Sequence, residues 1–431
     1  RTVTGVQTCA LPIYGVHGRK CNDWRRERGI LFDFGRGCCD TAANFSGMEE
    51  NPNLINEATT PVVEEATPKT ELWPKLGFAP HLAVMATLGA VLVLAFANTL
   101  HNTGFALDNK FIILEDPRLR DSKSENIKQI FQQDYWWPKA VSGLYRPLTT
   151  FSYMVNYKVL GSKDTAAGYH WTNFFIHWVN AVLVYFVVLA LMEKLWPAMF
   201  AAALFAVHPI VTESVTNIVG RADLFATLSV LLGTLLYMKS GAVSVERRPS
   251  VGAWAGMTGV AAVLGAFVFL HRQQSALLPA FLQGNFWLVL ALFALALVIA
   301  SICSMHGGFR SAFWLLVMMA VTTLGVFSKE SAVVVMGVVF LYDLTFRMPK
   351  RGNSWVLSFF ENMWGLLWRG YIAFVPVILA LWYVRSWVFA QLRPPELPFV
   401  DNPLIAADFW QARLTAIKVI GKYLALLLWP Q

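Results

Sequence analysis

Acidic, basic and hydrogen-bonding residues recur in this chain at the ends of long apolar runs, where they could act together on one polar substrate. A carboxylate in such a place can take the proton of an attacking hydroxyl group. Guanidinium and ammonium groups can bind a phosphate, the former as a planar fork and the latter as a point charge. The candidate residues are Asp108, Asn109, Arg146, His208, Glu213, Arg221, Asp223, Lys329 and Glu330.

The candidates lie within short motifs that are widely separated along the chain. The motifs are Asp108-Asn109-Lys110, Asp134-Tyr135-Trp136-Trp137, Tyr145-Arg146-Pro147-Leu148-Thr149, His208-Pro209-Ile210-Val211-Thr212-Glu213-Ser214-Val215, Gly220-Arg221-Ala222-Asp223-Leu224 and Ser328-Lys329-Glu330. His208 and Glu213 could bind a metal ion, but they do not form the His-Glu-x-x-His pattern. A structural interpretation is also open, with His208 at a helix end and Arg221 paired with Asp223 or Glu213.

Ten apolar runs must position these motifs. The chain is 56% hydrophobic and 14% charged, with a mean hydropathy of +0.48, whereas soluble domains carry about 25% charged residues. The runs are continuous and mostly near the ~20 residues that span a bilayer, unlike barrel strands. We therefore predict an all-α polytopic membrane protein. The predicted spans are 78–98, 172–192, 197–208 (a short one), 222–239, 253–270, 284–303, 311–327, 331–346, 370–389 and 412–429.

The distribution of Lys and Arg in the short loops predicts the orientation. The loops on one side hold Lys194, Lys239, Arg247, Arg248, Arg310, Arg347, Lys350, Arg351 and Arg369, and those on the other hold Arg221, Arg272, Lys329 and Arg393. The richer side should be cytoplasmic, since positive charge is retained there. The loop from about 99 to 171 and all the candidate residues then lie on the opposite, outer face. Charges at membrane depth are costly and point to function.

The long first outer loop contains a candidate interfacial helix. Its apolar residues Ile127, Ile130, Phe131 and Tyr135 fit one face of a helix. We predict that this helix lies on the membrane surface, with Trp and Tyr side chains as anchors.

The N-terminal segment differs from the rest of the chain. Residues 1–47 contain four of the five Cys and precede the first Met, Met48. We expect this segment to be upstream sequence that packs against nothing, although a genuine basic tail is the alternative. Residues 48–77 begin acidic and rich in Thr, Pro and Ala, which is typical of a disordered cytoplasmic tail. The membrane domain should comprise residues 78–431.

The order of the motifs resembles the membrane part of the transmembrane and tetratricopeptide-repeat O-mannosyltransferases and their bacterial relatives, of the glycosyltransferase C superfamily. The resemblance runs from Phe105 to Pro430 and is most specific between His208 and Leu224. The family often has paired acids where this chain has Asp108-Asn109. Relatives also continue into ~34-residue repeats beyond the point where this chain stops. We therefore expect a glycosyltransferase C-type bundle that is truncated at its C-terminus.

The resemblance implies transfer of a sugar, mannose by analogy, from a polyprenyl phosphate to a Ser or Thr hydroxyl group of a protein. A single displacement with inversion needs one base and a cationic cradle for the leaving phosphate. Asp108 is the candidate base. The donor phosphate would be bound by Arg146, Arg221 and Lys329, and the site would be shaped by Asn109, His208, Glu213, Asp223 and Glu330.

The expected partners are the polyprenyl-phosphate sugar, a protein acceptor and the lipid bilayer. We expect no metal, no separate cofactor and no nucleic acid. A bacterial cytoplasmic membrane is favoured over the endoplasmic reticulum, with the active site on the outer or luminal face. The alternatives are a transporter or membrane scaffold without enzymatic activity, and a lipid-donor glycosyltransferase that acts on a lipid or glycan. Transporters place charges near the bilayer midplane in related halves, whereas here they lie at helix ends.

Overall fold

The computed structural model describes residues 77–101, 104–106, 108–241, 309–347, 370–392 and 406–430, residue 404, and isolated residues between 258 and 295. Within these ranges the chain forms helices and no strand. The predictions for residues 1–47, for the tail before Gly77 and for the spans 253–270 and 284–303 lie outside the described residues.

The described helices confirm the all-α polytopic membrane class. Four are long and apolar enough to cross a membrane, and a fifth candidate bends by 48° at His208. A further apolar helix, α11, spans Phe309–Ser328. The four are α1 (Phe78–Leu100), α4 (Ala166–Met192), the segment Ile218–Ser240, which contains α7 (Arg221–Ser240), and the segment Tyr371–Phe389, which contains α14 (Val375–Phe389); the bent candidate joins α5 (Leu195–Val207) to residues Pro209–Thr216.

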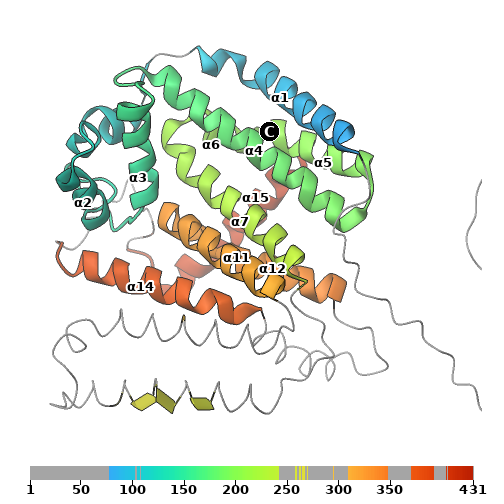
Figure 1. Cartoon of the computed structure of the whole chain (residues 1–431). Coiled ribbons are helices and arrows are strands. Elements are labelled where there is room, and N and C mark those ends of the chain that lie inside the picture. The colour runs from blue at the N-terminus through green and yellow to red at the C-terminus, as the bar shows by residue number, and fades with distance from the viewer. Residues whose placement is uncertain are drawn as a thin grey trace, which may run out of the picture. The chain divides into compact units, whose positions relative to one another are not determined.

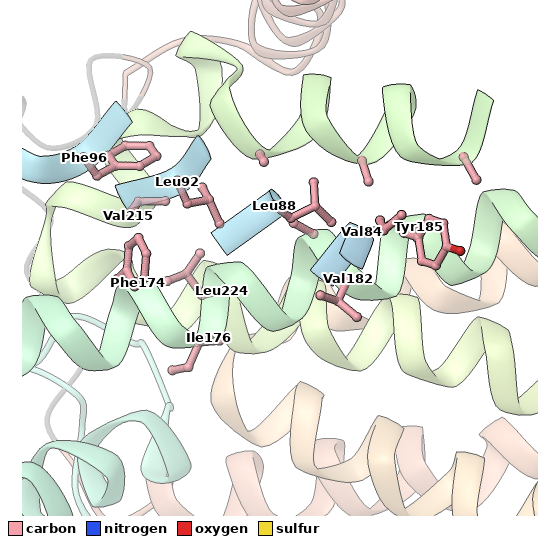
Figure 2. Packing of buried hydrophobic residues seen from close by; sticks show 14 of the residues in the cluster. Val84, Leu88, Leu92, Phe96, Phe174, Ile176, Val182, Tyr185, Val215 and Leu224 are labelled. Carbon is pink, nitrogen blue, oxygen red and sulfur yellow. The ribbon is translucent and has the colours of Figure 1, made fainter. Parts of the chain in front are cut away.

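Helix α4 is central to the first half of the bundle: it contacts α1 and α5, and also α7, which packs against α11 (Figure 1). Helix α1 turns a stripe of Val84, Leu88, Leu92 and Phe96 inward, at a spacing of four residues, against apolar side chains of α4 (Figure 2). Leu94, on another face of α1, is 81% exposed. This helix therefore separates a packing stripe from residues suited to contact lipid.

Helix α5 lies close to α4 because its buried residues are small. Ala198, Ala202 and Ala206 recur every fourth residue and are all fully buried. Small residues let two helix backbones approach each other, which favours packing in a membrane. The helix ends at Val207, because Pro209 cannot donate a backbone hydrogen bond.

Helix α4 carries a buried polar stripe along its length. His170, Asn173, His177 and Asn180 are all buried, at spacings of three and four residues. Three of them bond to backbone carbonyl groups of the segment from α5 to the first turn of α7. Asn173 donates to the carbonyls of residues 217 and 218, His177 lies 2.9 Å from that of Ala206, and Asn180 donates to that of Leu224.

A lobe of short helices lies at one end of the bundle (Figure 1). It has its own apolar core, in which Ile130 and Tyr135 are buried. The predicted surface helix is present as α2, but it ends at Gln132 and its Ile130 faces the lobe, while Phe131 is 38% exposed. The elements of the lobe are η2 (Lys110–Leu114), η3 (Pro117–Leu119), α2 (Ser124–Gln132), α3 (Pro147–Met154) and η4 (Val155–Val159).

Hydrogen bonds fasten this lobe to the ends of three bundle helices. Thr149 donates its hydroxyl to the carbonyl of Ser328 at 2.8 Å, at the end of α11. Tyr153 bonds the carbonyl of Ile218 before α7, and Arg385 of α14 bonds that of Gly143. The long loop and the three helix ends are therefore at one end of the bundle, as the sequence predicted.

Two of the predicted spans differ from their predicted form. The span 331–346 is divided into η7 (Glu330–Val334), α12 (Val335–Tyr342) and η8 (Asp343–Arg347). The span 412–429 forms α15 (Phe409–Leu428), but this helix is not among those apolar enough to cross a membrane, since it carries three basic residues. Its C-terminal end also lies beside His208, whose Nε2 is 3.1 Å from the carbonyl oxygen of Leu427. The predicted crossing of the membrane by residues 412–429 is therefore corrected: α15 is not one of the candidate spans.

Three short helical elements connect α5 to the start of α7, and Gly220 ends the last of them. They are η5 (Pro209–Val211) and α6 (Thr212–Thr216), followed by η6 (Ile218–Gly220). A Cβ atom on Gly220 would lie 2.6 Å from the carbonyl oxygen of Ser214 and 2.7 Å from its Cα. These are backbone atoms, which a rotamer change cannot move away.

We predict that Gly220→Ala destabilises the protein by about 1–3 kcal/mol, the usual cost of overpacking. The measurement is the thermal unfolding midpoint of the purified protein in detergent. Gly337→Ala in α12 is the matched control, because nothing lies within 4 Å of a Cβ there. Equal midpoints for the two variants would contradict the close approach at Gly220.

Candidate functional site

A cavity of about 540 Å³ lies between the lobe and the ends of the bundle helices. Its volume is within the range of small-molecule sites. The lining includes five of the residues selected from the sequence: Asp108, Arg146, Glu213, Asp223 and Lys329. Its other lining residues are Ile112, Tyr135, Trp136, Leu144, Ile210, Ser214, Asn217, Val219, Gly220 and Tyr423.

Two carboxylates in the cavity wall have no ion-pair partner among the described residues. Asp108 lies in the first turn before η2 and is exposed, and Glu213 lies in the first turn of α6 and is also exposed. The third, Asp223, forms an ion pair with Lys329 across the gap between α7 and α11. The cavity therefore combines carboxylates open to a ligand with one that is already neutralised.

Arg146, the second cation of the cavity, is half-buried and faces Glu330. Its Nη2 lies 3.3 Å from Oε1 of Glu330, and its guanidinium carbon lies 5.4 Å from the centre of the Tyr135 ring. Burial acts to raise the pKa of Glu330, but the nearby Arg146 and Arg385 outweigh it and the net pKa is lowered. Glu330 is therefore ionised at neutral pH and holds Arg146 at the cavity wall.

The lobe positions the aromatic part of the wall through a buried ion pair. Arg118 and Asp116 are 1% exposed and meet at 2.7 Å. The same guanidinium donates to the carbonyls of Asp134 and Tyr135. The Asp134 carboxylate in turn accepts from the backbone of Trp136 at 2.8 Å. These bonds fix the turn that presents Tyr135 and Trp136 to the cavity.

Burial raises the pKa of Tyr135. Its phenol therefore keeps its proton at neutral pH, and it donates or accepts a hydrogen bond with the hydroxyl of Tyr153 at 3.3 Å. Tyr135 thus belongs to the wall of the cavity and is unsuited to take a proton from a substrate.

The structure places Arg221 outside the cavity, which corrects its predicted role in phosphate binding. The side chain is completely buried. It donates to Asn156 at 2.6 Å and to Asn173 at 2.7 Å, and also to Ser152 and the carbonyl of Tyr169. With every guanidinium nitrogen occupied, Arg221 joins α3, η4, α4 and α7. Arg221 forms an ion pair with neither Asp223 nor Glu213, the two partners considered from the sequence.

His208 and Asn109 lie beside the cavity and do not line it. His208 accepts from the backbone N–H of Ile210 at 3.2 Å through Nδ1, so its Nε2 carries the proton and donates to Leu427. Asn109 is buried and accepts from the backbone N–H of Val219 at 3.0 Å. Asn109 thereby connects the segment of Asp108 to the turn before α7, whereas His208 caps the short helix η5.

Sequence reasoning missed the polar stripe of α4. Its signal was visible as His170, Asn173, His177 and Asn180 at helical spacing within an apolar run. It also did not single out the wall residues Leu144 and Ile210, whose types carry no chemical signal. Among the described residues no group of three or more His, Cys, Asp or Glu is placed to hold a metal ion.

An apolar groove of about 620 Å³ adjoins the cavity. Residues close together in the chain line one hollow or the other: Tyr145 lines the groove and Arg146 the cavity, while Phe327 lines the groove and Lys329 the cavity. The remaining groove residues come from α2, α3, α11 and α14. They are Lys128, Phe131, Gln132, Leu148, Thr323, Leu324, Tyr383, Val384 and Trp387.

Comparison with known proteins confirms the resemblance inferred from the motifs. Protein O-mannosyl-transferase TMTC3 of mouse is 38% identical over 32% of this chain and 15% of its own, and Tmtc1 of Drosophila melanogaster is 35% identical over 37% and 18%. Human TMTC4 is 26% identical over 74% of this chain and 38% of its own. The chain is thus a relative of the TMTC protein O-mannosyl-transferases and spans well under half their length. No family model and no solved structure matches it, so the glycosyltransferase C-type arrangement stays a prediction.

We predict that Arg221→Met lowers stability more than Arg146→Met does. The Arg221 variant leaves the buried amide oxygens of Asn156 and Asn173 without a donor, at about 1–3 kcal/mol each. Arg146 is partly exposed and forms a single ion pair, with Glu330, which is 35% exposed, so its loss should cost about 1 kcal/mol. Thermal unfolding in detergent measures both. A stable Arg221→Met protein that has lost only donor binding would restore Arg221 to the phosphate site.

Proposed function

We propose that this chain is the membrane part of a glycosyltransferase that moves a sugar from a polyprenyl phosphate to a Ser or Thr hydroxyl group of a protein. The observation that carries the proposal is the pairing of two adjacent hollows: a polar cavity with open carboxylates and two cations, and an apolar groove. A lipid-linked sugar has the same division, with a charged head next to an apolar chain. The names of the relatives supply mannose as the sugar and protein as the acceptor.

Asp108 is the proposed base. It is exposed at the cavity wall and carries no salt bridge among the described residues, so its carboxylate is available to an incoming hydroxyl group. In a single displacement the hydroxyl oxygen attacks the anomeric carbon opposite the phosphate, and Asp108 takes its proton. Glu213 is the other open carboxylate and would take this role if Asp108 does not.

Arg146 and Lys329 are the proposed ligands of the donor phosphate. Both line the cavity, and each lies one or two residues from a residue that lines the groove. A phosphate held there would have its lipid chain directed into the groove. The cations would stabilise the charge that develops on the leaving oxygen. Asn109, Asp223 and Glu330 would hold these groups in position.

The groove is proposed to hold the first isoprene units of the donor. Leu148, Leu324, Phe327 and Trp387 supply an apolar lining, to which Lys128 and Gln132 add two polar side chains. Burying apolar chain there is favourable by roughly 25 cal/mol per Å². The groove also argues against the scaffold alternative, because a scaffold has no use for a polar cavity beside an apolar groove.

The site is proposed to face the outer or luminal side, from the charge distribution of the short loops. The choice of a bacterial membrane over the endoplasmic reticulum stays a prediction, and the relatives named above are animal proteins. A transporter, or a transferase acting on a lipid or glycan, would share much of this architecture. Transfer to a protein acceptor decides among these alternatives.

We predict that Asp108→Asn lowers transfer by about 10²–10⁴-fold, the usual contribution of a general base. The amide keeps the shape of the carboxyl group but cannot take the proton, so donor binding should be retained. The assay follows labelled sugar from a polyprenyl-phosphate donor to protein, using the full-length protein. Arg146→Ala is the companion variant and should weaken donor binding as well as transfer.

Near-normal turnover by Asp108→Asn would remove Asp108 as the base and direct attention to Glu213. Failure of the wild-type protein to transfer any lipid-linked sugar would instead favour the transporter or scaffold alternative. Lys139→Ala is a suitable control, since this residue pairs with Glu115 on the lobe and does not line the cavity.

A further inference from the structure

Both cations of the cavity already have a carboxylate partner. Arg146 faces Glu330 through Nε and Nη2, at 3.5 and 3.3 Å, and Lys329 faces Asp223. The two pairs are adjacent, because Lys329 and Glu330 are consecutive at the end of α11. A site built only to bind an anion has no need for such partners, since each lowers the positive potential that the anion would meet.

We propose that Asp223 and Glu330 promote product release by weakening the hold of Lys329 and Arg146 on the phosphate that transfer leaves behind. This inference rests on the proposed function, and it assigns to the two carboxylates a task beyond that of holding the cations in place.

The product would be held more tightly than the donor because the phosphate gains negative charge during the reaction. The acceptor oxygen forms a bond to the anomeric carbon, the bond from that carbon to the phosphate oxygen breaks, and its electron pair stays on the phosphate. The hydroxyl proton goes to Asp108. The donor is a phosphodiester with one negative charge, whereas the product is a phosphate monoester with about −1.5 to −2 at pH 7. Attraction to the two cations therefore rises as the reaction proceeds.

Unpartnered cations would hold the product more tightly than the donor. Product release limits the turnover of many enzymes, so this difference would slow the cycle. A carboxylate on each cation opposes a dianion more than a monoanion, because repulsion scales with charge. The carboxylates therefore selectively weaken binding of the product.

The partial exposure of the two ion pairs allows a phosphate to displace the carboxylates from Arg146 and Lys329. The side chains of Arg146 and Glu330 are 14% and 35% exposed, and those of Lys329 and Asp223 are 22% and 44% exposed. Pairs at this depth are less screened than surface pairs, yet water can still reach the carboxylates when an anion displaces them. Arg146 also uses two of its three guanidinium nitrogens for Glu330, so a phosphate oxygen can approach the third.

A positioning role alone predicts the opposite result. If Asp223 and Glu330 only oriented the cations, their removal would loosen Lys329 and Arg146 and weaken binding of donor and product alike. The sign of the change in product affinity therefore distinguishes the two roles.

The experiment uses Asp223→Asn and Glu330→Gln in the full-length protein, since both keep the side-chain shape and remove the charge. Equilibrium binding of polyprenyl phosphate should tighten by about two- to fivefold, the effect of a pair of this kind, and donor binding should tighten less. In turnover, kcat should fall and inhibition by polyprenyl phosphate should strengthen.

Asp164→Asn is the matched control. It removes a carboxylate of the same type from the Arg120–Asp164 pair on the lobe, which does not line the cavity. Its binding and turnover should equal those of the wild type. Thermal unfolding is measured on every variant, so that a loss of fold is not taken for a loss of binding.

Unchanged or weaker binding of polyprenyl phosphate by both variants would overturn the inference, and so would loss of the fold in both, since the pairs would then be structural. The binding measurement decides this even if no turnover is seen. A wild-type protein that transfers no sugar defeats the proposed function. A wild-type protein that turns over, with variants that bind product no more tightly, defeats only this inference.

Discussion

The buried guanidinium of Arg221 is the interaction on which the remaining structure most depends. Arg221 is the first residue of α7, and its guanidinium donates hydrogen bonds to oxygens of α3, η4 and α4. Four elements therefore meet at one side chain. Its acceptors are neutral, and the rings of Tyr153 and Tyr169 lie 4.8 and 5.8 Å from its charged carbon. Hydrogen bonds to a charged donor and cation–π contacts together offset the loss of water. The lobe is thereby fixed to the bundle, and the cavity lies between these two parts.

The second constraint is the satisfaction of backbone carbonyls where helices break. Around the cavity α5 ends at a proline, and short helices carry the chain to α7, which leaves carbonyls without their helical partners. Within a membrane such groups must find partners inside the protein. Asn173 and His177 of α4 supply them. The polar stripe therefore permits irregular backbone next to the site, and irregular backbone is what brings Glu213 and Asp223 to the same wall.

The sequence predicted the helical class, four of the spans as continuous helices and the end of the bundle at which the motifs gather, because these follow from hydropathy and charge in continuous runs. It identified Asp108, Arg146, Glu213, Asp223 and Lys329, which the structure brings together. It misjudged Arg221, because a motif shows that an Arg matters and not whether its donors face a ligand or the protein. It also made α15 a span, although the three basic residues of that helix argued against a simple crossing. The groove was not locatable, since it forms from helices far apart in sequence.

Arg221 and Arg146 differ in burial, and this difference distinguishes an arginine that stabilises the fold from one that can bind a ligand. Arg221 keeps its charge at zero exposure only because each donor meets a fixed oxygen, so a ligand could bind it only by breaking several hydrogen bonds at once. Arg146 is half-buried and faces one carboxylate with two of its nitrogens, and its third nitrogen has no partner among the described residues, so an anion can reach it with little rearrangement. Side chains of the same type thus serve different ends according to the number and rigidity of their partners. This difference is set by three-dimensional packing, because both residues occur in equally distinctive motifs.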